Sequence, residues 1–348
     1  VWIMAYTAID KSSDYFDIKL YSGNGSTQTI AGLDLQPDWT WIKNRNAGEH
    51  HVLTDAVRGA NKQLNTNRAN AQLTLTTQLT AFTSDGFSVG AGSEVNNGSA
   101  IYVSWNWKAG TSFTNDASGT GIGSIDSNGS VSTTSGFSIV KWTGTGATGT
   151  IAHGLGAIPR MIIVKSLANA TAWMVQHASI GNAKEIYLNN NSGAGNSTAW
   201  NSTTPTSTVF SVTGGAGDGV NASGDYIAYC FTDVQGFLKI NSYVGNGNAN
   251  GTFICTGFKP AFVLYKSITG DDWFISDNKR LGYNPDNNYL RPSLATEEAD
   301  PPDRINLFSN GFKMTTNDDG ANGSGTTYIY MAFAESPFVS STSIPTTA

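Results

Sequence analysis

Three ionisable residues stand at equivalent places in a chain that repeats itself. Asp55, His177 and Asp277 each follow a short apolar, strand-like run. Most glycosidases use a pair of carboxylates for catalysis, so Asp55 and Asp277 keep a hydrolytic function open. The middle repeat carries His177 instead, which favours a structural polar position over a catalytic one. A polysaccharide depolymerase is therefore the second alternative function.

A lysine recurs in the same way. Lys43, Lys165 and Lys266 each stand six residues after a proline, at the end of a nearly continuous apolar run. Such runs are typical of strands that are buried on both faces. We predict a structural contact inside each repeat, in which Lys43 pairs with Asp55 and Lys266 with Asp277.

Other motifs that could bind a cofactor or a metal lack the required context. Gly144-x-Gly146-x-x-Gly149 resembles a dinucleotide fingerprint, but a second turn-prone run follows it where a helix is needed. His50 and His51 are neighbours, and adjacent strand residues point to opposite faces. The oxygen-rich loop 317–320 lacks the spacing and closing Glu of an EF-hand. We therefore predict no cofactor and no metal.

Trp200 differs from the other tryptophans because it lies in a loop of Asn, Ser, Thr and Gly, residues 189–205. An exposed Trp beside Asn196 and Asn201 would stack on a sugar ring while the amides bind its hydroxyls. The same residues would equally suit the docking of one β-sandwich on its neighbour. Both interpretations stay open.

The elements that position these residues recur three times. A Tyr/Trp-x-Gly-x-Gly motif comes early in each copy, and an aromatic strand closes it. The closing strands are 102–107, 226–231 and 328–333. The unit of roughly a hundred residues exceeds the ~20–50 residues of solenoid repeats, which indicates duplication of a small domain.

The composition predicts the fold class. Charged residues make up only 13% of the 348 residues, while 9 Trp, 13 Tyr and 16 Phe supply apolar area for burial. Frequent Gly and Asn turns between short apolar runs indicate many strands. We predict an all-β protein of three tandem antiparallel β-sandwich modules, jelly-roll-like in type.

The boundaries follow from the repeats and from the composition. We predict an N-terminal arm (1–15), β module A (16–113), a linker or long surface loop (114–135), β module B (136–235), β module C (236–338) and a C-terminal tail (339–348). Cys230 and Cys255 are interpreted as small buried apolar residues, and a disulfide between them stays open.

Two partner classes are disfavoured by charge and hydropathy. The net charge is −6 and the 20 Lys and Arg residues are scattered, so nucleic acid is not expected as a partner. No apolar run approaches the ~20 residues that span a bilayer, so no membrane partner is expected. The start, 1–4, is too short for a signal peptide, so we expect synthesis in a cytoplasm.

The motifs as a set resemble a repeat module of structural proteins from tailed bacteriophages, of the marine or cyanobacterial phage type. In module A the residues that carry the resemblance are Tyr21 to Gly25, Gly32-Leu33, Pro37, Ile42 to Arg45, Asp55 to Gly59, Ser84 to Phe87 and Tyr102 to Gly110. Modules B and C match with gaps, so the resemblance spans roughly 16–338. It brings no catalytic residues with it.

The resemblance implies a non-enzymatic structural protein on the virion surface, made in the host cytoplasm. The preferred expectation is a tail fibre or spike component for host attachment. The alternative is a capsid decoration protein, either a cement or a head-fibre component, suggested by the polar arm and by three modules of docking size. The expected partners are further copies of the chain, with a trimer as one candidate, other virion proteins and a host surface glycan.

Overall fold

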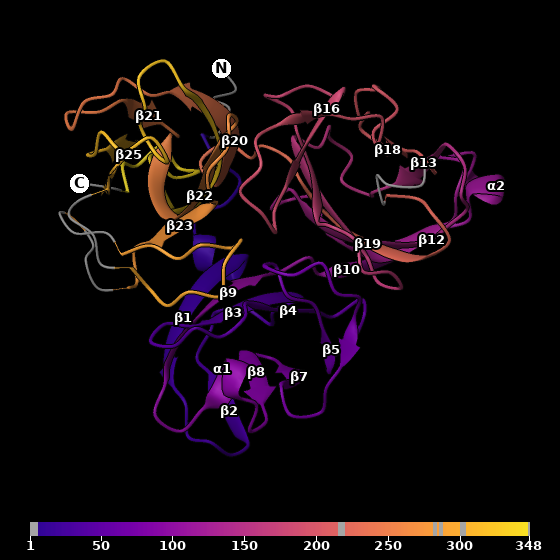
Figure 1. The fold of residues 1–348 in the computed structure, drawn as a ribbon, viewed down its shortest axis with the longest axis horizontal. Helices are drawn as coiled ribbons and strands as arrows, with labels where there is room; N and C mark the ends of the chain where they lie inside the picture. The colour runs from indigo at the N-terminus through magenta and orange to yellow at the C-terminus, as the bar shows by residue number, and fades with distance from the viewer. Residues whose placement is uncertain (1–5, 215–219, 281–283, 285–287, 300–303, 347–348) are drawn as a thin grey trace.

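The computed structural model describes residues 6–214, 220–280, 284, 288–299 and 304–346 of the chain. Its strands pair antiparallel throughout the three larger sheets, which confirms the predicted all-β class. Figure 1 shows three groups of strands around a common centre, with 16–107 below, 111–231 at upper right and 238–337 at upper left. Among the described residues, no helix is long and apolar enough to cross a membrane.

Module A contains two antiparallel sheets that face each other across an apolar layer. The larger has the order β1-β9-β3-β4 and the smaller β2-β8-β7. Their bounds are β1 (Phe16–Ser22), β2 (Gln28–Ala31), β3 (Trp39–Asn44), β4 (Val52–Asp55), β7 (Leu79–Thr83), β8 (Gly86–Val89) and β9 (Ile101–Trp107). The short elements of this region are η1 (Ser12–Asp14), β5 (Lys62–Gln63), β6 (Leu73–Thr74) and α1 (Ser93–Asn96).

The same strand order recurs inside the larger sheet of module B. Its eight strands follow the order β10-β11-β12-β19-β14-β15-β16-β17, and β13 pairs with β18 in a separate sheet. The bounds are β10 (Thr111–Asn115), β11 (Ser127–Ser132), β12 (Phe137–Gly144), β13 (Gly149–Ala152), β14 (Met161–Ser166), β15 (Met174–His177), β16 (Lys184–Tyr187), β17 (Gly195–Asn196), β18 (Val209–Val212) and β19 (Gly224–Phe231).

Module C repeats the order once more, as β20-β26-β22-β23 with a smaller sheet β21-β25-β24. The bounds are β20 (Leu238–Val244), β21 (Phe253–Cys255), β22 (Phe258–Ser267), β23 (Phe274–Asp277), β24 (Ile305–Phe308), β25 (Gly311–Met314) and β26 (Thr327–Pro337). The strands that follow the prolines were predicted to be buried on both faces. All six residues of β3 and all six of β14 are buried, which confirms that prediction.

Residues 114–135 differ from the expected linker or surface loop. They contain α2 (Ala117–Thr120) and β11, which adds to the edge of the module B sheet. The small residues here serve close packing: a Cβ on Gly129 would lie 1.9 Å from the carbonyl oxygen of Ile139. A run of Gly and Ser therefore marks a tightly packed strand here, although the same composition also suits a flexible chain.

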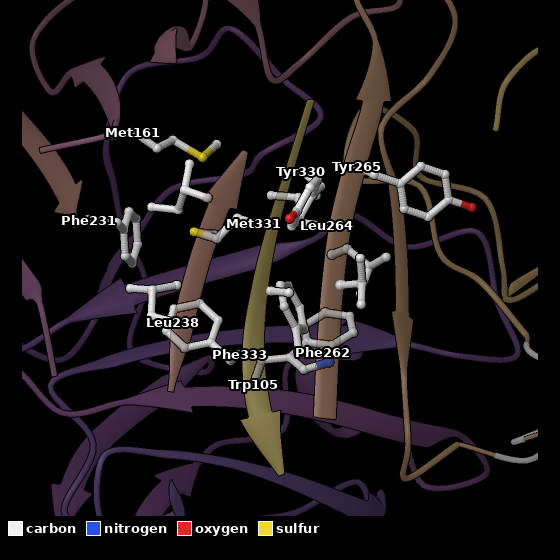
Figure 2. Close-up of a cluster of buried hydrophobic side chains, with 14 of the residues drawn as sticks. Trp105, Met161, Phe231, Leu238, Phe262, Leu264, Tyr265, Tyr330, Met331 and Phe333 are labelled. Carbon is white, nitrogen blue, oxygen red and sulfur yellow. The ribbon is translucent and has the colours of Figure 1, made fainter. Parts of the chain in front are cut away.

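One apolar core joins the three larger sheets. Aromatic rings at equivalent positions of β9, β19 and β26 meet there: Phe333 lies 5.8 Å from Trp107 and 6.1 Å from Phe231, measured between ring centroids. Figure 2 shows Phe262 and Phe333 beside Trp105 in this cluster. Such aromatic pairs add about 0.5–1.5 kcal/mol each beyond the area they bury. The three sheets are therefore held together as one packed unit.

The described N-terminal arm lies against module C and against the C-terminal tail. The Tyr6 hydroxyl donates to the Gly257 carbonyl at 2.7 Å, and Ile9 is buried in the common core. In the tail, the Ser341 amide donates to the Asp10 carboxylate at 2.6 Å. The described part of the N-terminal arm is therefore bound within the molecule.

Candidate functional site

The repeated ionisable residues lie where one sheet meets the next. Asp55, His177 and Asp277 are the last residues of β4, β15 and β23, and their exposed fractions are 0%, 0% and 2%. Each points across to a neighbouring module, so the structure has three junctions. We name them the A–B junction (Asp55), the B–C junction (His177) and the C–A junction (Asp277).

The A–B junction is built on a buried ion pair. Arg58 Nε lies 2.5 Å from Asp55 Oδ2, and the Tyr229 hydroxyl of module B donates to the same carboxylate at 2.7 Å. Burial, reinforced by the Asp55 carboxylate, raises the pKa of Tyr229 well above its ordinary value. Its hydroxyl therefore stays protonated and remains a donor.

The C–A junction repeats this chemistry with a different donor. Arg280 Nε lies 2.7 Å from Asp277 Oδ2, and Trp105 Nε1 of module A donates to that oxygen at 3.1 Å. Glu298 is a second acidic residue at this junction, and both Arg280 and Arg45 donate to its carboxylate. Although burial opposes the shift, the hydrogen bond from Arg45 and the charge of Arg280 lower the pKa of Glu298 to about 2.

The B–C junction has no carboxylate at this position. His177 Nδ1 accepts from the Ser179 amide at 3.2 Å, so the proton lies on Nε2, which is 3.4 Å from the Tyr330 carbonyl oxygen. Burial lowers the pKa of His177 to about 4, so the imidazole is neutral at pH 7. Ile180 stands where the other junctions have Arg58 and Arg280.

Strand register shows that the donors are equivalent residues. Trp105 pairs with Trp41, Tyr229 pairs with Ile163 and Met331 pairs with Leu264, each at the same step of the shared ladder. Two of these positions therefore supply an N–H or O–H to a carboxylate. The third position is Met331 on β26, whose side chain has no N–H or O–H. The residue of module B that faces β26 is the neutral His177 and not a carboxylate.

The recurring lysines do not pair with these carboxylates, so the predicted Lys43–Asp55 and Lys266–Asp277 contacts are wrong. In the β3–β4 hairpin Asp55 lies opposite Trp39 at the far end from Lys43, and Phe262 lies opposite Asp277 in the same way. The carboxylates are also already occupied by arginine. The lysine ammonium groups donate to other acceptors.

Each lysine donates to backbone carbonyl groups. Lys43 Nζ binds the oxygens of Asn44 and Ala47 at 2.7 and 3.1 Å. Lys165 Nζ binds Ser166, Asn169 and, across the A–B boundary, Ala69 at 3.0, 3.2 and 3.2 Å. Lys266 Nζ binds Asp271 and, across the B–C boundary, Asn190. Burial lowers the pKa of all three lysines to about 8.

Two tryptophans make a second set of bonds across the same boundaries. Trp173 Nε1 donates to the Asn65 carbonyl at 2.9 Å, and Trp273 Nε1 donates to the Tyr187 carbonyl at 2.7 Å. The acceptors lie in the middle segment of the preceding module, the part that varies most between the repeats. These segments therefore take part in the contact between modules.

The predicted carbohydrate site at Trp200 is wrong in its central feature. Trp200 is only 2% exposed and packs in the core between the two sheets of module B, so its ring cannot stack on a sugar. Asn196 and Asn201 are exposed on the surrounding loop. The polar composition of the loop therefore gave no indication that Trp200 is an apolar core residue.

The remaining candidate residues also have structural partners. His51 Nδ1 accepts from Trp41 Nε1 at 2.9 Å, and the run after Gly149 forms β13, which leaves no helix for a dinucleotide. Cys230 is buried, but Cys255 is exposed, which corrects its predicted burial; both are free thiols. Within the described ranges, no group of three His, Cys, Asp or Glu side chains could hold a metal ion.

Chemically, the junctions are suited to holding modules together. The carboxylates of Asp55 and Asp277 each accept from an arginine and from the side-chain O–H or N–H of an aromatic residue. Breaking a buried ion pair of this kind is strongly destabilising. Sequence reasoning missed the partners Tyr229 and Trp105. The Asp-x-x-Arg spacing, present in modules A and C and absent at His177, was a signal for the arginine partners Arg58 and Arg280 but not for these two donors.

Comparison with known proteins gives one match. Residues 11–337 match the model of a family described as "Domain of unknown function (DUF7483)". No curated protein and no solved structure matches the chain.

Proposed function

We propose that the chain, which belongs to the DUF7483 family, is a non-enzymatic structural protein exposed on the surface of a phage particle. Its role there is host attachment, as a component of a tail fibre or spike. The phage context comes from the resemblance of its repeated motifs to structural proteins of tailed phages.

The observation that carries this proposal is the closed set of junctions. Module A contacts B through Asp55 and Tyr229, B contacts C through His177, and C contacts A through Asp277 and Trp105. The ionisable residues that recur in the repeats are thus used to join modules. A chain closed on itself in this way is a rigid support, which suits a particle component that must survive outside the cell.

The depolymerase alternative was based on Asp55 and Asp277, and the surroundings of these residues argue against it. Asp55 and Asp277 are buried and ion-paired with Arg58 and Arg280. A glycosidase needs one carboxyl group that can give up a proton and a second that reaches the sugar or its attacking water. Neither residue is placed for such a role.

The capsid-decoration alternative rested partly on a polar N-terminal arm that could dock on a head. The described arm residues are instead bound to module C through Tyr6 and to the C-terminal tail through the pair Asp10–Ser341. This feature favours a fibre or spike component over a protein that docks on a head through its arm. Other copies of the chain and other virion proteins remain the proposed partners.

The test is to locate the protein on intact particles of the encoding phage, with gold-labelled antibody and a pre-immune serum as control. We expect label at the tail. Label spread over the head would overturn the attachment role and favour decoration. Absence of the protein from purified particles would overturn the virion assignment itself.

A further inference from the structure

Module B carries a hollow at the extended edge of its larger sheet. Strands β10 and β11 extend its larger sheet beyond β12, whereas the sheets of modules A and C end at β1 and β20. This extension and the end of β12 enclose an open hollow of about 710 Å³. That size lies within the range of ligand-binding pockets.

The hollow has a polar lining. Thr114, Asp116 and Asn128 come from the added hairpin and its loop, and Lys141 and Thr143 come from β12. Asp126, Ser124, Ser127 and Thr145 complete the polar wall. The two large apolar residues of the lining, Ile125 and Trp142, are only 8% and 2% exposed, so they give a ligand little apolar surface.

A second hollow continues from the first. It has a volume of about 570 Å³, shares Lys141 with the first hollow and lies against module A through Lys62 and Gln72. Asp225 lines the second hollow and binds two residues that line the first, Lys141 at 2.8 Å and the Thr143 hydroxyl at 2.7 Å. Together the two hollows form one elongated surface, which we name the B groove.

Several polar groups of the B groove retain bonding capacity for a ligand. Asp126 uses Oδ1 to accept from the Ala117 amide, and each carboxylate oxygen has a further lone pair. Asn128 is exposed at the second position of β11, between Thr114 and Lys141 on the neighbouring strands. Amide, hydroxyl and carboxylate groups in a row match a ligand with regularly spaced hydroxyls.

We propose that the B groove binds an extended, uncharged polysaccharide chain, an inference that rests on the proposed attachment function. A peptide helix would need apolar anchors, which the lining keeps buried. An acidic polysaccharide or a nucleic acid would meet Asp116 and Asp126. Neither of these carboxylates has a salt bridge to a described residue.

The test uses the full chain on an array of neutral, basic and acidic oligosaccharides, followed by calorimetric titration of the neutral oligosaccharide that binds most tightly. Asn128→Trp would plug the groove and is expected to remove binding. Asp126→Asn keeps the Oδ1 acceptor but removes the charge and is expected to weaken binding about tenfold. Asp85→Asn, an equally exposed carboxylate of module A, is the matched control and should bind like the parent chain.

The outcomes separate this inference from the function it rests on. Circular dichroism and the melting temperature identify a variant that fails to fold, in which case Asp126→Asn carries the test. Binding only to acidic glycans or to peptides, neutral-glycan binding that survives Asn128→Trp in a folded protein, or no binding at all would overturn the B groove site. Label at the tail without glycan binding would leave the attachment role standing and discard this site alone.

Discussion

At the A–B junction Asp55 accepts from Arg58 and from Tyr229, whereas at the B–C junction a neutral His177 lies against the Tyr330 carbonyl. The backbone positions are equivalent and both residues are buried. The A–B junction thus contains a charge with its counter-charge and an extra donor. The B–C junction contains no charge at this position.

This difference shows that the identities of three residues are linked at each junction. They are the last residue of the strand, the residue three positions after it and the residue that faces it from the neighbouring module. A buried carboxylate is tolerated where a guanidinium lies three residues on and the neighbouring module supplies an N–H or O–H. Module C supplies Met331 at that position, and module B then has His177 and Ile180 in place of Asp and Arg. The chemistry of a junction is therefore decided jointly by two modules.

The largest expected effect comes from breaking a charged junction. Asp55→Ala would leave the Arg58 guanidinium buried without its counter-charge and Tyr229 without its acceptor. We expect a loss of about 3–5 kcal/mol in the free energy of unfolding, measured by urea titration of tryptophan fluorescence. Asp34→Ala is the control: it removes only an exposed ion pair with Lys11 and a hydrogen bond from Ser13, so it should shift the urea midpoint far less. A midpoint for Asp55→Ala equal to that of the control would contradict the role of the junction.

The next effect tests whether the junction chemistry can be exchanged. His177→Asp would place a buried carboxylate beside Ile180 and Met331, with a loss of about 3–4 kcal/mol. Adding Ile180→Arg and Met331→Tyr rebuilds the arrangement of the A–B junction, and we expect the triple variant to recover at least half of that loss. Urea titrations of the single and triple variants check this. If the triple variant is no more stable than His177→Asp alone, the three residues do not act as a set.

Much of the fold could be predicted from the sequence, because its signals are local. Apolar alternation, turn glycines and the aromatic closing strands indicated an all-β protein, and the unbroken apolar runs indicated central strands such as β3 and β14. Equivalence of Asp55, His177 and Asp277 was visible from the repeat. These features depend on residues that are near one another in the chain.

The rest could not be predicted because it depends on contacts between distant segments. Tyr229 lies 174 residues from Asp55, and Trp105 lies 172 residues from Asp277. The polar loop around Trp200 gave no sign that the ring turns inward. The Gly and Ser residues near Gly129 suited a linker as well as a packed strand, and only the neighbouring strand β12 distinguishes the two.

A smaller effect is expected from pH at the B–C junction. The pKa of His177 is about 4 in the folded protein, below its ordinary 6.5, so protonation favours the unfolded chain. Its contribution is fully present above pH 6.5 and is lost as the pH falls from 6.5 to 4. We expect up to about 3 kcal/mol of acid destabilisation from this group.

Urea titrations at a series of pH values would measure this loss. His177→Gln should show a shallower loss of stability over the window than the parent chain. Burial also lowers the pKa of His153 to about 4. The contribution of His153 to acid destabilisation is the same in both proteins and does not affect the comparison. Equal slopes for the two proteins would show that His177 is not the titrating group of this junction.

The smallest effect concerns a single hydrogen bond of the A–B junction. Tyr229→Phe removes the hydroxyl that donates to Asp55 and accepts at 3.5 Å from Arg58 Nη2, and it leaves the Arg58–Asp55 ion pair in place. Because the acceptor is charged, we expect a loss of about 2 kcal/mol in the free energy of unfolding. The same substitution in an Asp55→Ala background should cost much less, since the acceptor is then gone, and this double-mutant cycle isolates the bond. An equal cost in both backgrounds would mean that the hydroxyl stabilises the junction through a partner other than Asp55, such as Arg58 Nη2 at 3.5 Å. The difference between the charged and neutral junctions would then rest on the Asp–Arg pair alone.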